Sequence, residues 1–145
     1  MVETMRIIML SFFASIGFGI VFQIRGRNLV LAGIGGALTR AVYLLLMQVT
    51  DSRIVYITLA ALFASCYGEL LAVRAKVPST YYIYPSIIPL IPGDLFYFAL
   101  LGLIRGDMEA LSANGMKCAL SLVGMSIGFV LSTTVVHYIR VTLMK

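Results

Sequence analysis

The stretch YYIYPSIIPLIPGD, residues 81–94, decides how this chain folds because it carries three prolines in a mostly apolar run. A proline inside a helix lacks a backbone N–H, and its ring clashes with the carbonyl four residues earlier. The residue before each proline is also pushed away from the α conformation, and Gly93 permits almost any backbone angle. We therefore expect Pro85, Pro89 and Pro92 to break the helix between residues 85 and 93.

The composition of the whole chain shows which solvent surrounds this stretch. The 145 residues are 61% hydrophobic and only 12% charged, with a mean hydropathy of +1.01, whereas soluble domains are typically about 45–50% apolar and about 25% charged. A disordered segment is excluded as well, since disorder requires low hydrophobicity. A soluble domain of this length buries only about two-thirds of its surface, which leaves the lipid bilayer as the solvent that suits the chain.

Five stretches are long enough to cross a bilayer, for which about 20 mostly apolar residues are needed. We expect an all-α, polytopic membrane protein with about five transmembrane helices, the fourth broken by prolines, in a single transmembrane domain. The connections are short, and the longest runs from Arg105 to Lys117. Neighbouring spans should therefore be adjacent and antiparallel. The expected spans cover roughly residues 5–24, 28–48, 54–73, 81–105 and 118–139.

The formal net charge is +5, but the positive charges lie between the apolar runs, as membrane topology requires. They form no basic patch of the kind that binds nucleic acid. With five spans, six Lys and Arg fall on the side of the C-terminus and four on the other side. This count predicts a cytoplasmic C-terminus and an N-terminus outside. If Arg40 keeps residues 28–48 from spanning, four spans remain and the orientation changes.

Small residues recur every four positions in three of the expected spans. In lipid such ridges let helix backbones approach closely, because the hydrophobic effect does not drive helices together there. We expect each ridge to pack tightly against another helix, either within the chain or in a partner. The ridges are Ser11, Ser15 and Gly19; Ala60, Ala64, Gly68 and Ala72; and Gly124, Gly128 and Ser132.

The proline segment is also the candidate substrate site. Irregular backbone at membrane depth is tolerated only where it is buried in protein or lines a watery cavity, and transporters use broken helices to place helix ends near the bilayer midplane. A second helix that starts near Asp94 or Leu95 would present N–H groups to an anionic group. The freed carbonyls near Pro85 to Ile88 would face an ammonium group. The alternative is a single kinked helix in which Asp94 only caps the following turn.

Two charged residues inside the expected spans add to this candidate site. Arg40 lies near the centre of the second span, where an arginine costs about 2.5–3.5 kcal/mol to insert. It should face protein or water and pair with an acid, for which Asp94 and Glu69 are the candidates. Arg40 then either binds a substrate carboxylate or forms a structural ion pair. Asp94, as an acid at membrane depth, could carry a proton or meet an ammonium group.

The chain shows none of the patterns that indicate an enzyme. It has one His and two cysteines, Cys66 and Cys118, which form neither a CxxC pair nor a metal-ligand set. It also lacks a G-x-S-x-G, an H-E-x-x-H and a P-loop. We therefore expect neither a hydrolase nor an ATP-driven pump, and no bound metal or cofactor in this chain.

Three further motifs carry a family resemblance: Gly17-Phe-Gly-Ile-Val-Phe22, Gly33-x-x-Gly36-Ala37 and Pro89-Leu-Ile-Pro92-Gly93. Together they resemble the threonine/serine exporter family. More narrowly, the chain is similar to the small subunit of the split form, which is equivalent to the C-terminal membrane half of the fused exporters. The resemblance covers nearly the whole chain, and the P-x-x-P-G element after a basic loop is its most specific part.

The resemblance implies proton-motive-force-driven export of threonine and serine from a bacterium, through the cytoplasmic membrane and with a larger partner subunit. In some members the substrate is a small dicarboxylate such as succinate. The resemblance places Pro89, Pro92 and Gly93 in the family element, and Arg40 where relatives carry a polar or basic residue. Relatives carry apolar residues at the position of Asp94. A non-transporting subunit that stabilises its partner, and a homo-oligomer of the chain, stay open as alternatives.

Overall fold

The computed structural model describes residues 2–143 of the chain, and the side chains of residues 2–136. Every regular element in that range is helical, which confirms the all-α prediction. In chain order the elements are α1 (Val2–Val21), α2 (Arg27–Val49), α3 (Arg53–Ala75), α4 (Thr80–Ile87), the 3-10 helix η1 (Ile88–Leu90), α5 (Gly93–Arg105) and α6 (Met108–Leu143).

Helices α1, α2, α3 and α6 are each long and apolar enough to cross a membrane, α6 over Met108–Val136. The segment Thr80–Leu90 and helix α5 together make a further candidate span, which is bent by 52° at the break between its two parts. Up to five candidate spans with a broken fourth span agree with the architecture that the sequence predicts. The chain is therefore a multi-pass membrane protein.

The break is shorter than predicted and lies at Ile91 and Pro92. Helix α4 passes through Pro85, so the expectation of irregular backbone from residue 85 onward is wrong. Pro85 stands in the second turn of α4, where its missing N–H removes only one helical hydrogen bond. Ile88 keeps helical angles in front of Pro89, and the turn there tightens to a 3-10 helix. Only Ile91 takes the extended conformation that a following proline favours.

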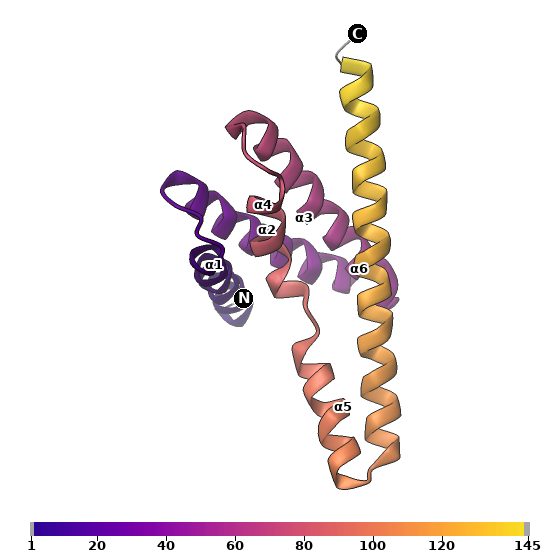
Figure 1. Ribbon diagram of the computed structural model, residues 1–145. Helices are drawn as coiled ribbons and strands as arrows, with labels where there is room; N and C mark the ends of the chain where they lie inside the picture. The colour runs from indigo at the N-terminus through magenta and orange to yellow at the C-terminus, as the bar shows by residue number, and fades with distance from the viewer. Residues whose placement is uncertain (1, 144–145) are drawn as a thin grey trace.

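Helices α3 and α6 pack side by side through small residues (Figure 1). A Cβ atom at Gly128 would lie 2.5 Å from the carbonyl oxygen of Thr58, too close for any side chain. The Thr58 hydroxyl donates a hydrogen bond to the carbonyl oxygen of Gly124 at 3.0 Å. Every residue of the three predicted small-residue ridges is buried, so the prediction that these ridges pack against other helices is confirmed.

The connection between α5 and α6 is shorter than the predicted stretch Arg105–Lys117, and that prediction is wrong. Only Gly106 and Asp107 join the two helices. Gly106 ends α5 in a left-handed conformation with a φ of 72°. The Asp107 carboxylate accepts a hydrogen bond from the N–H of Ala110 at 2.9 Å and so caps the start of α6. The charges that follow lie on exposed faces of a helix and do not mark a loop.

Helix α5 and the first part of α6 form a hairpin that extends away from the other helices (Figure 1). Among the described elements, α5 packs only against α6. Helices α1, α2 and α4 pack on one another, and η1 lies against α1, α2 and α3. The break at residues 91–92 therefore joins the hairpin to the group of helices that comes before it.

Candidate substrate-binding site

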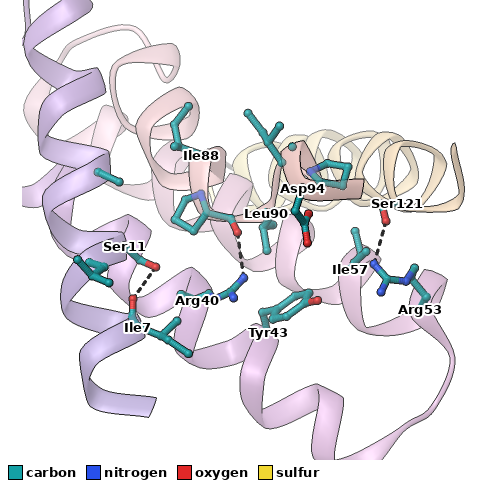
Figure 2. A pocket seen from close by; sticks show the side chains of 16 residues that line it. Ile7, Ser11, Arg40, Tyr43, Arg53, Ile57, Ile88, Leu90, Asp94 and Ser121 are labelled. Atoms are coloured by element: carbon teal, nitrogen blue, oxygen red, sulfur yellow. Dashed lines mark hydrogen bonds between the residues drawn. The ribbon is translucent and has the colours of Figure 1, made fainter. Parts of the chain in front are cut away.

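A cavity of about 510 Å³ lies beside the helix break, with residues of η1 and the start of α5 along one wall. Helices α1, α2, α3 and α6 supply the other walls (Figure 2). This volume falls within the range of about 300–1,000 Å³ that is typical of small-molecule pockets. The polar side chains that line the cavity are Ser11, Arg40, Tyr43, Arg53, Asp94 and Ser121.

The helix break supplies Arg40 with its hydrogen-bond acceptor. In a continuous helix the N–H of Gly93 would bond to the carbonyl of Pro89, but here it donates to the carbonyl of Ile91 at 2.9 Å. The freed carbonyl oxygen of Pro89 accepts a hydrogen bond from Nη1 of Arg40 at 3.1 Å. The prediction that Arg40 pairs with an acid is therefore corrected, because its hydrogen-bond partner in the structure is a backbone carbonyl.

Arg40 keeps donors that a ligand can use. A guanidinium has five N–H donors, and the bond to Pro89 uses one of them, at Nη1. The guanidinium carbon lies 4.8 Å from the centre of the Tyr43 ring, a distance at which a cation–π interaction operates. Arg40 is thus held at the cavity by two neutral groups, the Pro89 carbonyl and the Tyr43 ring, and its charge is available to a carboxylate.

Asp94 brings the opposite charge to the same cavity. Helix α5 begins at Gly93 with Pro92 in the cap position, so Asp94 belongs to the first helical turn and is not the cap. Its carboxylate points from the break into the cavity, toward the level of Arg40 and Tyr43 (Figure 2). A carboxylate is favourable at a helix N-terminus, where the first N–H groups have no helical acceptors. The kinked-helix alternative therefore does not describe this segment.

Arg53 is a second cation of the cavity that no sequence pattern predicts. Its Nη1 donates a hydrogen bond to the hydroxyl of Ser121 on α6 at 3.4 Å. The Ser121 hydroxyl donates in turn to the carbonyl oxygen of Lys117 at 2.7 Å. These bonds hold the Arg53 side chain across the contact between α3 and α6. No local motif marks Arg53, because its place in the cavity follows from the packing of those two helices.

The structure brings all but one of the predicted site residues to the cavity. Pro85 is the exception, since it is buried inside α4 and does not line the cavity. The expectation of freed carbonyls near residues 85–88 is accordingly corrected, because the carbonyl that the break frees is that of Pro89, which accepts a hydrogen bond from Arg40. The predicted residues that do line the cavity are Arg40, Pro89, Pro92, Gly93 and Asp94.

The chemistry available in the cavity is recognition of charges and of hydrogen-bonding groups. Among the described residues, no group of three or more His, Cys, Asp or Glu side chains could hold a metal ion. The cavity offers two guanidinium groups, one carboxylate, hydroxyls and the N-terminus of α5. A pocket of mixed charge on this scale suits a small solute that itself carries both charges.

Comparison with known proteins supports a particular family. The profile of the family described as Threonine/Serine exporter, ThrE, matches residues 7–135, a range that contains every residue lining the cavity. No curated protein and no solved structure matches the chain. The matched family is the one that the three sequence motifs resemble, so the resemblance is confirmed at the level of the family.

Proposed function

Because this chain belongs to the threonine/serine exporter family, we propose that it is a membrane subunit of a secondary exporter that moves threonine and serine out of the cell. Its apolar helices suit a multi-pass membrane protein, and its family handles small-molecule substrates. The observation that carries the proposal is that Arg40 and Asp94, two opposite charges within candidate membrane-spanning segments, line one cavity at a helix break.

An amino acid is a zwitterion, and the cavity offers a group for each of its charges. The free donors of Arg40 and the first N–H groups of α5 suit the carboxylate of the substrate. The carboxylate of Asp94 suits its ammonium group. The hydroxyl of Ser11, which donates to the Ile7 carbonyl at 2.9 Å, can still accept a hydrogen bond from a substrate hydroxyl.

The proposal includes a larger partner subunit and coupling to the proton motive force, in the cytoplasmic membrane of a bacterium with the N-terminus outside. Asp94 supports the coupling, because an acid inside a span can take up and release a proton. Helix α5 supports the partner, since it packs only against α6 among the described elements and exposes Phe96, Tyr97 and Phe98. A second copy of this chain is the other protein that this face could accept.

Threonine export from proteoliposomes that contain the exporter complex tests the role of Arg40. Arg40→Ala should lower kcat/KM by about tenfold or more, because a charge-assisted hydrogen bond contributes about 1.5–3 kcal/mol. Arg40→Lys keeps the charge but loses the planar arrangement of N–H donors. Its kcat/KM should therefore lie between those of the parent complex and of Arg40→Ala. Arg105→Ala, which removes an exposed arginine outside the cavity, is the control and should not change export.

Unchanged kcat/KM in Arg40→Ala would contradict the assignment of the cavity. A lower yield of the complex with unchanged flux per complex would point instead to a structural subunit that stabilises its partner. Both quantities come from the same preparation, because the amount of complex is measured before the vesicles are loaded.

A small dicarboxylate such as succinate is the second candidate substrate, and Arg53 favours it. With Arg40, it gives the cavity two guanidinium groups, one for each carboxylate. Asp94→Asn separates the candidates, because removal of the negative charge should weaken transport of threonine and strengthen transport of succinate. If threonine is the substrate, its transport should fall in this variant, and if succinate is the substrate, its transport should rise. Unchanged transport of both would contradict the role given to Asp94.

A further inference from the structure

A row of buried polar groups runs along α2, away from the cavity. The hydroxyls of Ser15, Thr39 and Ser86 belong to completely buried residues, and none has a hydrogen-bond partner in the part of the chain that the structure describes. The buried Nε of Arg40, the residue after Thr39, has none there either. Four such atoms near one another need an explanation, because about 90% or more of buried polar groups are paired.

The three hydroxyls meet where α1, α2 and α4 pack on one another. Gly36 faces the hydroxyl of Ser15 on α1, and Gly35 faces the hydroxyl of Ser86 on α4; a Cβ atom at either glycine would collide with that hydroxyl. Thr39 lies one turn later on α2, and its position around the helix axis falls between those of the two glycines. The hydroxyls of α1 and α4 therefore lie directly against the backbone of α2.

This row connects the cavity with the opposite end of α2. On the cavity side it begins with Ser11, which lines the cavity. On the other side, the Tyr67 hydroxyl donates to the carbonyl oxygen of Leu31 at 2.8 Å, and the Tyr82 hydroxyl donates to Oδ1 of Asn28 at 2.9 Å. Asn28 is half-buried at the start of α2. At 1.5 Å per residue, the row extends for about 18 Å along α2.

The packed arrangement is unfavourable for these hydroxyls. Serines elsewhere in the helices bond back to their own helix, as Ser126 does to the Leu122 carbonyl at 2.9 Å. A methyl group does not fit between Gly36 and Ser15, so a bridging water does not fit there either. Unpaired and buried, the hydroxyls gain partners whenever the helices separate and admit water or a polar solute.

We propose that this row is the closed section of the substrate path, which a second conformation opens between α1, α2 and α4. In that conformation Ser15, Thr39 and Ser86 contact water and the passing amino acid, whose charged and hydroxyl groups supply the missing hydrogen bonds. Gly35 and Gly36 leave room for the solute because no side chain projects from them. The inference rests on the proposed function, since it takes the cavity to be the substrate site.

The interface between α3 and α6 is as tight as this row but has a different chemistry. Ala61 is completely buried there, against Gly128, and the Thr58 hydroxyl is satisfied by the Gly124 carbonyl. Because these side chains gain no hydrogen bond from separation, the interface should stay closed to water. It therefore provides a matched control of equal burial.

Cysteine accessibility tests the inference without relying on transport. In the full exporter complex, with Cys66 and Cys118 replaced by alanine, Ser15→Cys and Ser86→Cys are each treated with a charged, water-soluble methanethiosulfonate. We expect both to be labelled, with a rate that changes about tenfold on addition of threonine, because the substrate shifts the population of closed and open states. Ala61→Cys in the α3–α6 interface should stay unlabelled.

The outcomes separate the inference from the proposed function. If Ser15→Cys and Ser86→Cys are as unreactive as Ala61→Cys while threonine is exported, the inference is wrong and the proposed function stands. If their labelling responds to succinate and not to threonine, the path is supported and threonine is the wrong substrate. Labelling that responds to neither solute overturns the path.

A further variant distinguishes a path from a merely structural contact. Thr39→Val replaces the unpartnered hydroxyl by a methyl group of similar shape, so it favours the closed packing. We expect this variant to assemble with a higher Tm than the parent complex, and to slow the labelling of Ser15→Cys severalfold. Equal labelling rates with Thr39 and with valine at that position would overturn the inference.

Discussion

The guanidinium of Arg40 on α2 donates a hydrogen bond of 3.1 Å to the carbonyl oxygen of Pro89 in η1 (Figure 2). This bond exists because the helix stops before Gly93, whose N–H would occupy that carbonyl in a continuous helix. The break and the intramembrane arginine depend on each other. The break provides an acceptor, and the arginine satisfies a carbonyl that would otherwise be unpaired at membrane depth.

Pro92→Ala should reduce export while the complex still assembles. The alanine restores a backbone N–H and releases Ile91 from the extended conformation that a following proline imposes. An interior proline costs a helix about 3 kcal/mol, so its removal favours a continuous helix that takes back the Pro89 carbonyl from Arg40. The measurement is threonine flux per complex in proteoliposomes.

Pro85→Ala is the matched control for that variant. Pro85 is buried inside α4 and does not line the cavity. Its replacement should leave flux per complex unchanged and make α4 slightly more stable. Equal losses of flux in both variants would show that the prolines act through general helix stability, and the role given to the break would be wrong.

Gly128→Ala should destabilise the contact between α3 and α6. The new Cβ atom would lie 2.5 Å from the Thr58 carbonyl oxygen and 2.8 Å from the Cβ of Ala61, and overpacking of this kind costs about 1–3 kcal/mol. The Tm of the purified protein in detergent should fall. Gly115→Ala on the same helix meets nothing within 4 Å and should not lower the Tm. A Tm that is the same in both variants would contradict this packing.

Ser121→Ala should raise KM and change kcat little, because it removes the acceptor that holds Arg53 in the cavity. A hydrogen bond from a charged donor contributes at most about 1.5–3 kcal/mol, and this one is long at 3.4 Å, so we expect an increase in KM of about two- to tenfold. Initial export rates over a series of threonine concentrations give both constants. Ser126→Ala, an exposed serine that bonds within its own helix, is the control. An unchanged KM in Ser121→Ala would place Arg53 outside the binding site.

Asp107→Ala should lower the free energy of unfolding by about 1 kcal/mol, because it removes the cap of α6. Asp107→Ser keeps a hydroxyl that can accept the hydrogen bond from the Ala110 N–H and should restore most of the loss. Both values come from thermal or denaturant unfolding in detergent. Transport should be the same in both variants, since this residue lies outside the cavity.

The helix break could be predicted because prolines act through local covalent geometry, but its position could not. Pro85, Pro89 and Pro92 impose the same restriction on the residues before them. Only Ile91 yields to it, while Pro85 stays within a helix that is buried against α2 and α3. Which proline breaks a helix thus depends on tertiary packing, which no local pattern contains.

The sequence predicts those residues of the candidate site whose side chains are energetically costly to place inside a membrane. Arg40 and Asp94 stand out in the sequence because charges are rare inside apolar spans. Arg53 does not stand out, because a charge at the beginning of a helix is common. Its side chain reaches the cavity only through the packing of α3 against α6. The same holds for Ser15 and Ser86, which have no hydrogen-bond partner among the described residues because of how three helices pack together.

The length of α6 determines where the hairpin meets water. Its 36 residues extend for about 54 Å, whereas the hydrocarbon layer is about 30 Å thick. The helix must therefore lie obliquely or emerge into the aqueous phase, and the exposed charges of Glu109 and Lys117 favour emergence at its beginning. An epitope or fluorophore inserted at Gly106 would then report on which face of the bilayer this tip emerges, about 20 Å from the break that shapes the cavity.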